Sequence, residues 1–151
     1  AMHAFYLRNF YVENRLATGR LDIAGQRIDL ASIKNSSYVV SAENDHIVPW
    51  HAAYATTQLV SGPVRFVLSS GGHIAGVVNP PGPKGWYLSG DDVPPQAEKW
   101  RESAHRNVGS WWEDWTAWIG GRSGPLGTPP AVGSVVHPPL DDAPGIYVHE
   151  K

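Results

Sequence analysis

Two side chains in the first half of the chain, Asp45 and His73, have the residue types and the surroundings of a catalytic acid and base. Each follows a short apolar segment, at residues 38–40 and 64–68 respectively. We predict that both segments are strands, and open α/β sheets place their chemistry just beyond the carboxyl ends of strands. A carboxylate bonded to one imidazole nitrogen leaves the other nitrogen free to take a proton from a nucleophile. Asp45 and His73 are therefore predicted to be two members of a catalytic triad.

The third member of this triad, the nucleophile, is missing from the chain. In α/β-hydrolases the nucleophile, acid and base follow one another in that order, so the nucleophile is expected before Asp45. The chain contains no cysteine, and none of its serines lies in a Gly-x-Ser-x-Gly turn. We therefore expect the C-terminal part of a larger enzyme, inactive by itself. The alternative is that Asp45 only caps a helix and His73 only lines a turn.

The pattern between and around the two strands predicts the elements that position the pair. Residues 49–60 start with proline and have helical spacing, so they are expected to form the crossover helix of a parallel βαβ unit. Other elements are predicted as follows: helices at 2–16, 96–105 and 109–119, a hairpin at 20–28, and a long loop at 79–85. We predict an α/β portion over residues 1–120 and an extended Pro/Gly-rich tail over 121–151.

Composition narrows the function further. The chain has 151 residues, a net charge of −2 and 17% charged residues, so no basic field for nucleic acid or anionic membrane is expected. No apolar run approaches the roughly 20 residues of a membrane span. His46 and His51 fit one helix face poorly, so no metal site is predicted around Asp45. His46 is instead expected to line the pocket.

Four of the seven tryptophans lie in the predicted helix 109–119, with the spacing i, i+1, i+4 and i+7 (Trp111, Trp112, Trp115 and Trp118). Core or interface packing is the simpler interpretation of this spacing. The alternative is a contact surface for an apolar polymer or a lipid-coated body.

Several motifs resemble the polyhydroxyalkanoate synthases, which polymerise bacterial polyesters. The matching segments are Asp-His-Ile-Val-Pro-Trp at 45–50, Gly-His-Ile-Ala-Gly-Val-Val-Asn-Pro-Pro at 72–81, Gly-Ser-Trp-Trp-x-x-Trp at 109–115, and shorter matches at 6–14 and 29–33. The resemblance extends from about residue 5 to residue 118, and together these motifs are specific.

The resemblance implies an α/β-hydrolase fold with a Cys-Asp-His triad whose acid and base match Asp45 and His73. Asn14 falls where the family has a residue near the channel for CoA. The implied substrate is a 3-hydroxyacyl-CoA, with no cofactor. The implied partners are the growing polyester, the upstream Cys-bearing part and a second copy in a homodimer, in the cytoplasm on polyester granules. The alternatives are a non-catalytic assembly or granule-binding piece, or half of a related esterase or depolymerase.

Overall fold

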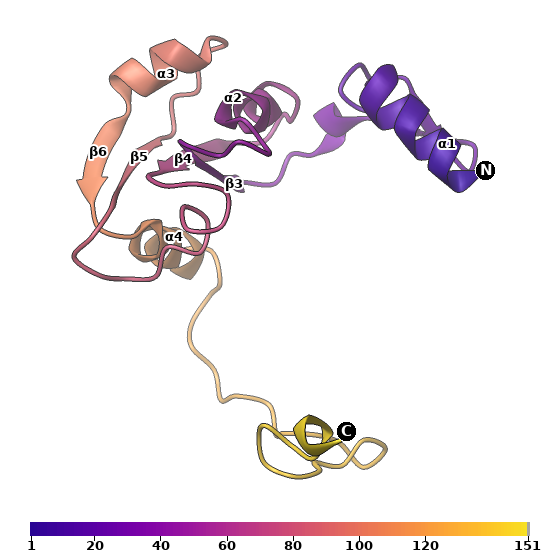
Figure 1. Cartoon of the computed structure of the whole chain (residues 1–151), viewed down its shortest axis with the longest axis vertical. Coiled ribbons are helices and arrows are strands. Elements are labelled where there is room, and N and C mark those ends of the chain that lie inside the picture. Colours follow the sequence, from indigo (N-terminus) through magenta and orange to yellow (C-terminus); the bar gives the residue numbers. More distant parts are fainter. Residues whose placement is uncertain (151) are drawn as a thin grey trace. The chain divides into compact units, whose positions relative to one another are not determined.

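The computed structural model of the chain describes residues 1–150. The chain divides into two units, Ala1–Ile119 and Gly120–Lys151. The second unit contains one short 3-10 helix, Tyr147–His149, and is otherwise irregular over its described residues. The first unit contains the β-sheet and the helices that cover it (Figure 1).

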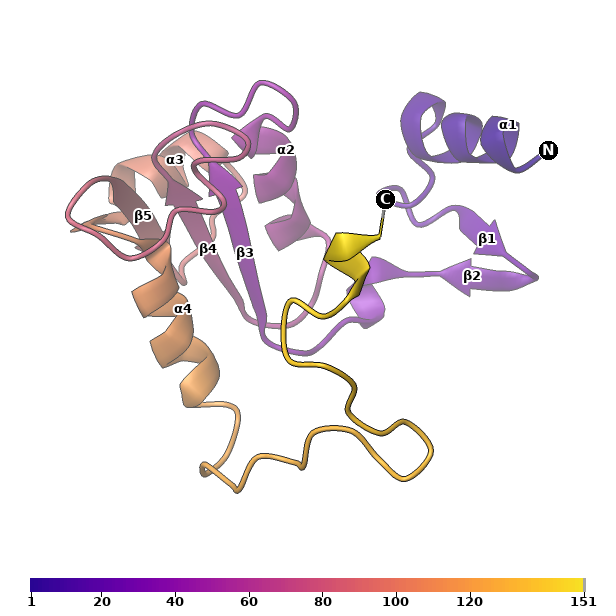
Figure 2. The ribbon, with the colours of Figure 1, turned by 60° about the horizontal axis from the view of Figure 1, so that its bottom comes forward.

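The sheet has four strands in the order β3-β4-β5-β6. Their bounds are Ser37–Ala42, Val64–Ser69, Trp86–Gly90 and His105–Val108. β3 and β4 run parallel, side by side (Figure 2), whereas β4–β5 and β5–β6 are antiparallel. The predicted α/β class and its two parallel strands are confirmed. The sheet that holds these two strands is larger than predicted, because the chain turns back after the loop at 79–85 and adds β5 and β6 to it.

The helices differ from their predicted lengths. The crossover helix α2 is only Trp50–Tyr54 and tightens into a 3-10 helix at Ala55–Gln58. At the N-terminus, α1 spans Met2–Tyr6 and continues as a π-helix over Leu7–Val12. The hairpin at 20–28 is confirmed as β1, Leu21–Ile23, paired with β2, Gln26–Ile28. A 3-10 turn follows at Leu30–Ser32.

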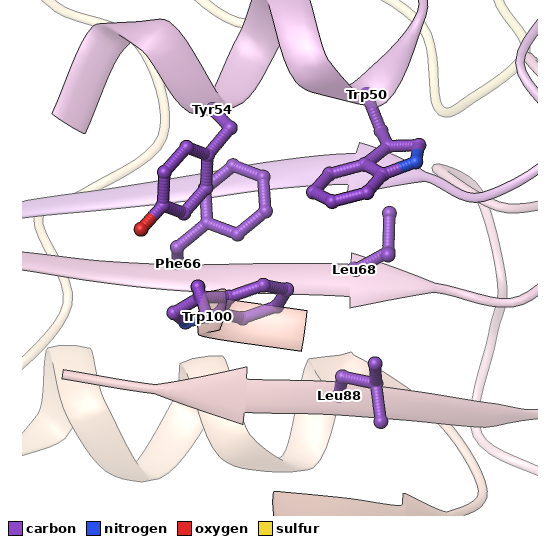
Figure 3. Packing of buried hydrophobic residues seen from close by; sticks show 6 residues of the cluster. All are labelled: Trp50, Tyr54, Phe66, Leu68, Leu88 and Trp100. Atoms are coloured by element: carbon purple, nitrogen blue, oxygen red, sulfur yellow. The ribbon is translucent and has the colours of Figure 1, made fainter. Parts of the chain in front are cut away.

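One face of the sheet is covered by α2 and by α3, which spans Ala97–Ser103. Alternate strand residues point to this face and pack with the two helices into an aromatic core (Figure 3). Its buried members are Trp50, Tyr54, Phe66, Leu68, Leu88 and Trp100. A side chain at Gly90 would bring a Cβ to 3.0 Å from the indole nitrogen of Trp100, so this glycine makes room for the largest core residue.

The opposite face carries α4, Trp111–Gly120. Arg65 on β4 donates two hydrogen bonds to Asp114 of this helix, at 2.7 and 2.5 Å. The Tyr38 hydroxyl on β3 donates a third, at 2.7 Å. Burial alone would raise the pKa of Asp114, but the bonds from Arg65 and then Tyr38 outweigh it and lower that pKa. These charge-assisted bonds fix α4 to the sheet.

The tryptophans of α4 are not core residues. None of the residues of this helix is buried, and Trp112 and Trp115 are 37% and 42% exposed. Trp111 and Trp118 are half-buried against Tyr38, with ring centroids 6.3 and 5.3 Å away. Core packing is therefore the wrong interpretation for Trp112 and Trp115, whereas packing at an interface and a contact surface for a polymer both stay open for them.

Among the described residues, no helix combines the length and the apolar character that crossing a bilayer requires.

Asp114→Ala should lower the free energy of unfolding by about 2 kcal/mol, because the Nε and Nη2 atoms of the mostly buried Arg65 guanidinium lose their partner and only the exposed Asp91 stays paired with it. Asp22→Ala is the matched control. Asp22 also pairs with an arginine, Arg27, but its side chain is 52% exposed against 17% for Asp114. The control should cost less than about 0.5 kcal/mol. Urea unfolding measures both, and equal losses would contradict the role of burial.

Candidate active site

Asp45 and His73 are brought into direct contact. The Nδ1 atom of His73 lies 2.8 Å from Oδ2 of Asp45. Asp45 follows the end of β3, and His73 follows the end of β4. The predicted meeting of an acid and a base at the carboxyl edge of two parallel strands is thus present in the geometry.

Backbone pairing beyond the strands holds the two loops together. The amide of Glu43 donates to the carbonyl of Ser69 at 2.9 Å, and the amide of Asn44 donates to the carbonyl of Gly71 at 2.9 Å. The pairing of β3 with β4 therefore continues for two residues into the loops. The chain leaving β4 turns sharply at Gly71, which has a φ of +107° that residues with a Cβ rarely adopt.

The second oxygen of Asp45 has a different task. Oδ1 accepts hydrogen bonds from the amides of Ile47 and Val48, both at 2.8 Å. These bonds close a local turn ahead of α2, and the N-cap residue of that helix is Pro49. The alternative interpretation, in which Asp45 only caps the helix, is therefore wrong. One carboxyl group both fixes its own loop and contacts the imidazole.

Electrostatics assign the proton between the two groups. The pKa of Asp45 is lowered to about 2. The hydrogen bond from the amide of Val48 is the main cause, and the bonds from His73 and Ile47 add to it, whereas burial acts in the opposite direction. Asp45 is then a carboxylate at neutral pH and accepts hydrogen bonds only. The Nδ1 atom of neutral His73 must carry the ring proton, which leaves a lone pair on Nε2. The carboxylate side chain is only 5% exposed, whereas the imidazole is 40% exposed and can meet a reactant.

The loop that carries His73 is a tight helical turn. The amide of Gly76 donates to the carbonyl of Gly72, and that of Val78 to the carbonyl of Ile74, both at 2.8 Å. A Cβ at Gly76 would lie 2.5 Å from the Cβ of Ala42, at the end of β3. The absence of a side chain at this position therefore lets the His73 turn rest directly on the strand that leads to Asp45.

The other two predicted site residues do not contact the pair. His46 is exposed, and its ring makes no hydrogen bond within residues 1–150. Asn14 has a φ of +43° in the turn after the N-terminal helix, where its carbonyl accepts from the hydroxyl of Thr18. No hydrogen bond joins its side chain to Asp45 or His73 in the described part of the chain. Over the same residues, no group of three or more His, Asp or Glu side chains could hold a metal ion.

A further tether on the acid loop was not predicted. Arg101 on α3 donates to the carboxylate of Glu43, two residues before Asp45. The same guanidinium lies 5.9 Å from the ring centre of Trp50. Because 58 residues separate Arg101 from Glu43, no local pattern could have indicated this pairing.

No family model matches the chain. Curated proteins nevertheless match it over nearly all of its residues. It is 43% identical to the poly(3-hydroxyalkanoate) polymerase subunit PhaC of Cupriavidus necator over 152 residues, which cover 99% of this chain and 26% of that protein. It is 41% identical to the poly(3-hydroxyalkanoate) polymerase 2 of Ectopseudomonas oleovorans over 150 residues, covering 98% and 27%. It is 37% identical to the polymerase subunit PhaC of Rhizobium etli over 152 residues, covering 100% and 24%.

The chain belongs with the C-terminal part of the polyhydroxyalkanoate synthases. The resemblance seen in its motifs is thereby confirmed. The chain spans about a quarter of the length of the curated relatives it matches. The activity of these relatives therefore belongs to polypeptides about four times as long as this chain.

Gly76→Ala should separate the acid from the base, because its Cβ would overlap that of Ala42 at 2.5 Å. We expect the chain to lose about 1–3 kcal/mol of stability through overpacking. The imidazole Nδ1 proton of His73, followed by NMR, should lose the shift of a charge-assisted hydrogen bond. Gly72→Ala is the matched control, since its Cβ would meet only the carbonyl of Asn44 at an ordinary 3.6 Å. An intact Nδ1 signal in Gly76→Ala would contradict this role.

The stability that Asp45 contributes should depend on pH in a defined window. Its folded-state pKa of about 2 lies below the ordinary 3.8. A carboxyl with a lowered pKa stabilises the fold above its unfolded pKa and loses that effect as pH falls through its folded pKa. The difference in unfolding free energy between the chain and Asp45→Asn should therefore be constant at neutral pH and shrink between about pH 4 and pH 2. Urea unfolding across this range measures it, and a difference that persists at pH 2 would refute the assignment.

Proposed function

We propose that this chain supplies the acid and the base of the Cys-Asp-His triad of a polyhydroxyalkanoate synthase. The reaction is polymerisation of 3-hydroxyacyl-CoA with release of CoA, and no cofactor is needed. The observation that carries the proposal is the hydrogen bond between Asp45 and Nδ1 of His73, with Nε2 left as the acceptor. The names of the relatives, poly(3-hydroxyalkanoate) polymerases, support a polymerisation reaction.

In this mechanism His73 moves the protons and Asp45 orients it. Nε2 of His73 takes the proton of a cysteine thiol, and the thiolate attacks the thioester carbonyl of the substrate. The carbon–sulfur bond to CoA breaks, and the departing CoA thiolate takes the proton from the imidazolium. The acyl group is now on the cysteine. Nε2 next removes the proton from the 3-hydroxyl of another 3-hydroxyacyl-CoA, whose oxygen attacks the acyl thioester on the cysteine. The carbon–sulfur bond to the cysteine breaks, and the departing cysteine thiolate takes the proton back from the imidazolium. The chain is then one ester bond longer and ends in the CoA thioester of the added monomer.

The cysteine must come from outside these 151 residues, since the chain has none. The other parts of an α/β-hydrolase fold would supply it. The outer edge of β3 supports this arrangement, because β3 pairs only with β4 among the described strands. An unpaired edge accepts a further strand, and a strand added beside β3 would end next to Asp45. By itself the chain is expected to release no CoA.

Substrate binding is proposed for two more residues. His46 adjoins Asp45 in sequence and its imidazole is exposed, so it can border the substrate. Asn14 is assigned to the channel for CoA on the family resemblance alone. A homodimer and association with polyester granules in the cytoplasm complete the proposal.

The exposed tryptophans favour a second candidate, a non-catalytic piece that binds a granule surface or a partner subunit. Trp112 and Trp115 present indole rings to solvent on one helix. In that case the contact between Asp45 and His73 would serve only to join two loops, and CoA release would not depend on it. The esterase or depolymerase alternative is disfavoured, because the similar proteins are polymerases.

His73→Ala separates these candidates when it is made in a polypeptide that also contains the cysteine-bearing part. CoA release from 3-hydroxybutyryl-CoA should fall by at least about a thousandfold, because the general base is lost. His51→Ala is the control: this histidine is also exposed, and it pairs with Glu98 on α3. Its rate should stay within about twofold of the original, as for a surface change away from the site. Unchanged CoA release in His73→Ala, with folding intact by circular dichroism, would leave only the assembly role.

A further inference from the structure

An apolar cavity lies beside the loop that carries His73. Its volume is about 330 Å³, and it is lined by Val77, Val78, Trp111, Trp112 and Trp115. The size falls within the range of sites that hold small molecules. Two valines after β4 form one wall, and the tryptophans of α4 form the other.

The valine wall follows His73 in the same loop. The amides of Gly76 and Val78 donate to the carbonyls of Gly72 and Ile74, so residues 72–78 form two overlapping hydrogen-bonded turns. Val77 comes four residues after His73 in these turns, and Val78 follows it. The apolar lining thus begins in the loop segment that carries the imidazole.

The wall is held in place by hydrogen bonds that leave the cavity itself apolar. The indole N–H of Trp111 donates to the carbonyl of Val77 at 3.2 Å. The buried hydroxyl of Ser110 donates to the carbonyl of Asn79 and accepts from the amide of Trp112 at 3.1 Å. These hydrogen bonds connect the loop that carries His73 to the start of α4, and they occupy the carbonyls of Val77 and Asn79. The cavity is therefore preformed, which lowers the entropic cost of binding.

The lining selects for one kind of occupant. No charged side chain lines the cavity, so the phosphates of CoA have no partner there. The lining is almost wholly apolar. An aliphatic polyester matches it better than CoA does, because its repeating unit is uncharged and carries an alkyl group.

We infer that this cavity, between the His73 turn and the tryptophans of α4, binds the last-added units of the growing polyester chain. The inference rests on the proposed polymerase function and adds a binding site to it. A chain held here stays beside the reacting groups between additions, so release is slower than extension. The cavity should therefore influence the length of the product. Another part of the polypeptide or a second copy of the chain packed into the cavity are the competing occupants.

The test uses the polypeptide that contains both this chain and the cysteine-bearing part. Trp115→Ala should weaken binding of a methyl-esterified 3-hydroxybutyrate tetramer about tenfold, as expected for the loss of about 1.4 kcal/mol of aromatic contact. Isothermal titration calorimetry measures this affinity. The mean length of the polymer made from a fixed supply of 3-hydroxybutyryl-CoA should fall in parallel. Chain length is a suitable readout, because a smaller folded fraction lowers the yield without shortening each chain.

Trp118→Ala is the matched control. It removes an indole from the same helix, but Trp118 packs on Tyr38 and does not line the cavity. Tetramer affinity and polymer length should stay near those of the unsubstituted protein. Equal losses in both variants would mean that the tryptophans only stabilise α4, and an unsubstituted protein that does not bind the tetramer would mean that protein fills the cavity. Either result overturns the inference. Failure of the polymerase proposal itself is seen separately, as CoA release that does not depend on His73.

Discussion

The register between β3 and β4 is the constraint on which the rest of the structure depends. Tyr38 lies opposite Arg65, and Ala42 lies opposite Ser69, at the carboxyl ends of both strands. Since side chains alternate between faces, a slip of one residue would exchange the two faces of either strand. Phe66 would leave the aromatic core and Arg65 would enter it. The same slip would move the acid loop relative to the base loop, so the core and the site are determined together.

The parts of the site that the sequence could predict are those encoded by neighbours in the chain. Two apolar strands, each followed by a polar loop, are local patterns, and the parallel crossover between them brings the loops to one edge. β5 and β6 were not predictable in this way. β6 reads His-Arg-Asn-Val, with three polar residues out of four. It becomes a strand because it pairs with β5 in an antiparallel arrangement. The periodicity of its own residues gives no sign of this pairing.

The tryptophans of α4 also show that a local pattern predicts an element but not its environment. Their spacing predicts a helix correctly, and aromatic residues on one helix face usually pack in a core. In this chain the core face of the sheet is already filled by α2 and α3. α4 is instead bound to the other face through Asp114, a polar residue of its own sequence, and through Arg65 and Tyr38 on the strands. Because an ion pair between the helix and the sheet anchors it, the outer tryptophans need not be buried for the helix to stay in place.

The division between buried and open groups at the site follows from this architecture. The carboxylate of Asp45 has all its bonds inside the chain: two from backbone amides and one from His73. Its lowered pKa keeps it ionised through the neutral range, so it can orient the imidazole and stabilise its protonated form without exchanging protons itself. In the proposed mechanism, proton movement is then confined to Nε2 of His73, on the exposed side of the ring. Asp45, whose hydrogen bonds all lie inside the chain, is the group that this mechanism needs to stay fixed, and the exposed His73 is the group that would meet the nucleophile.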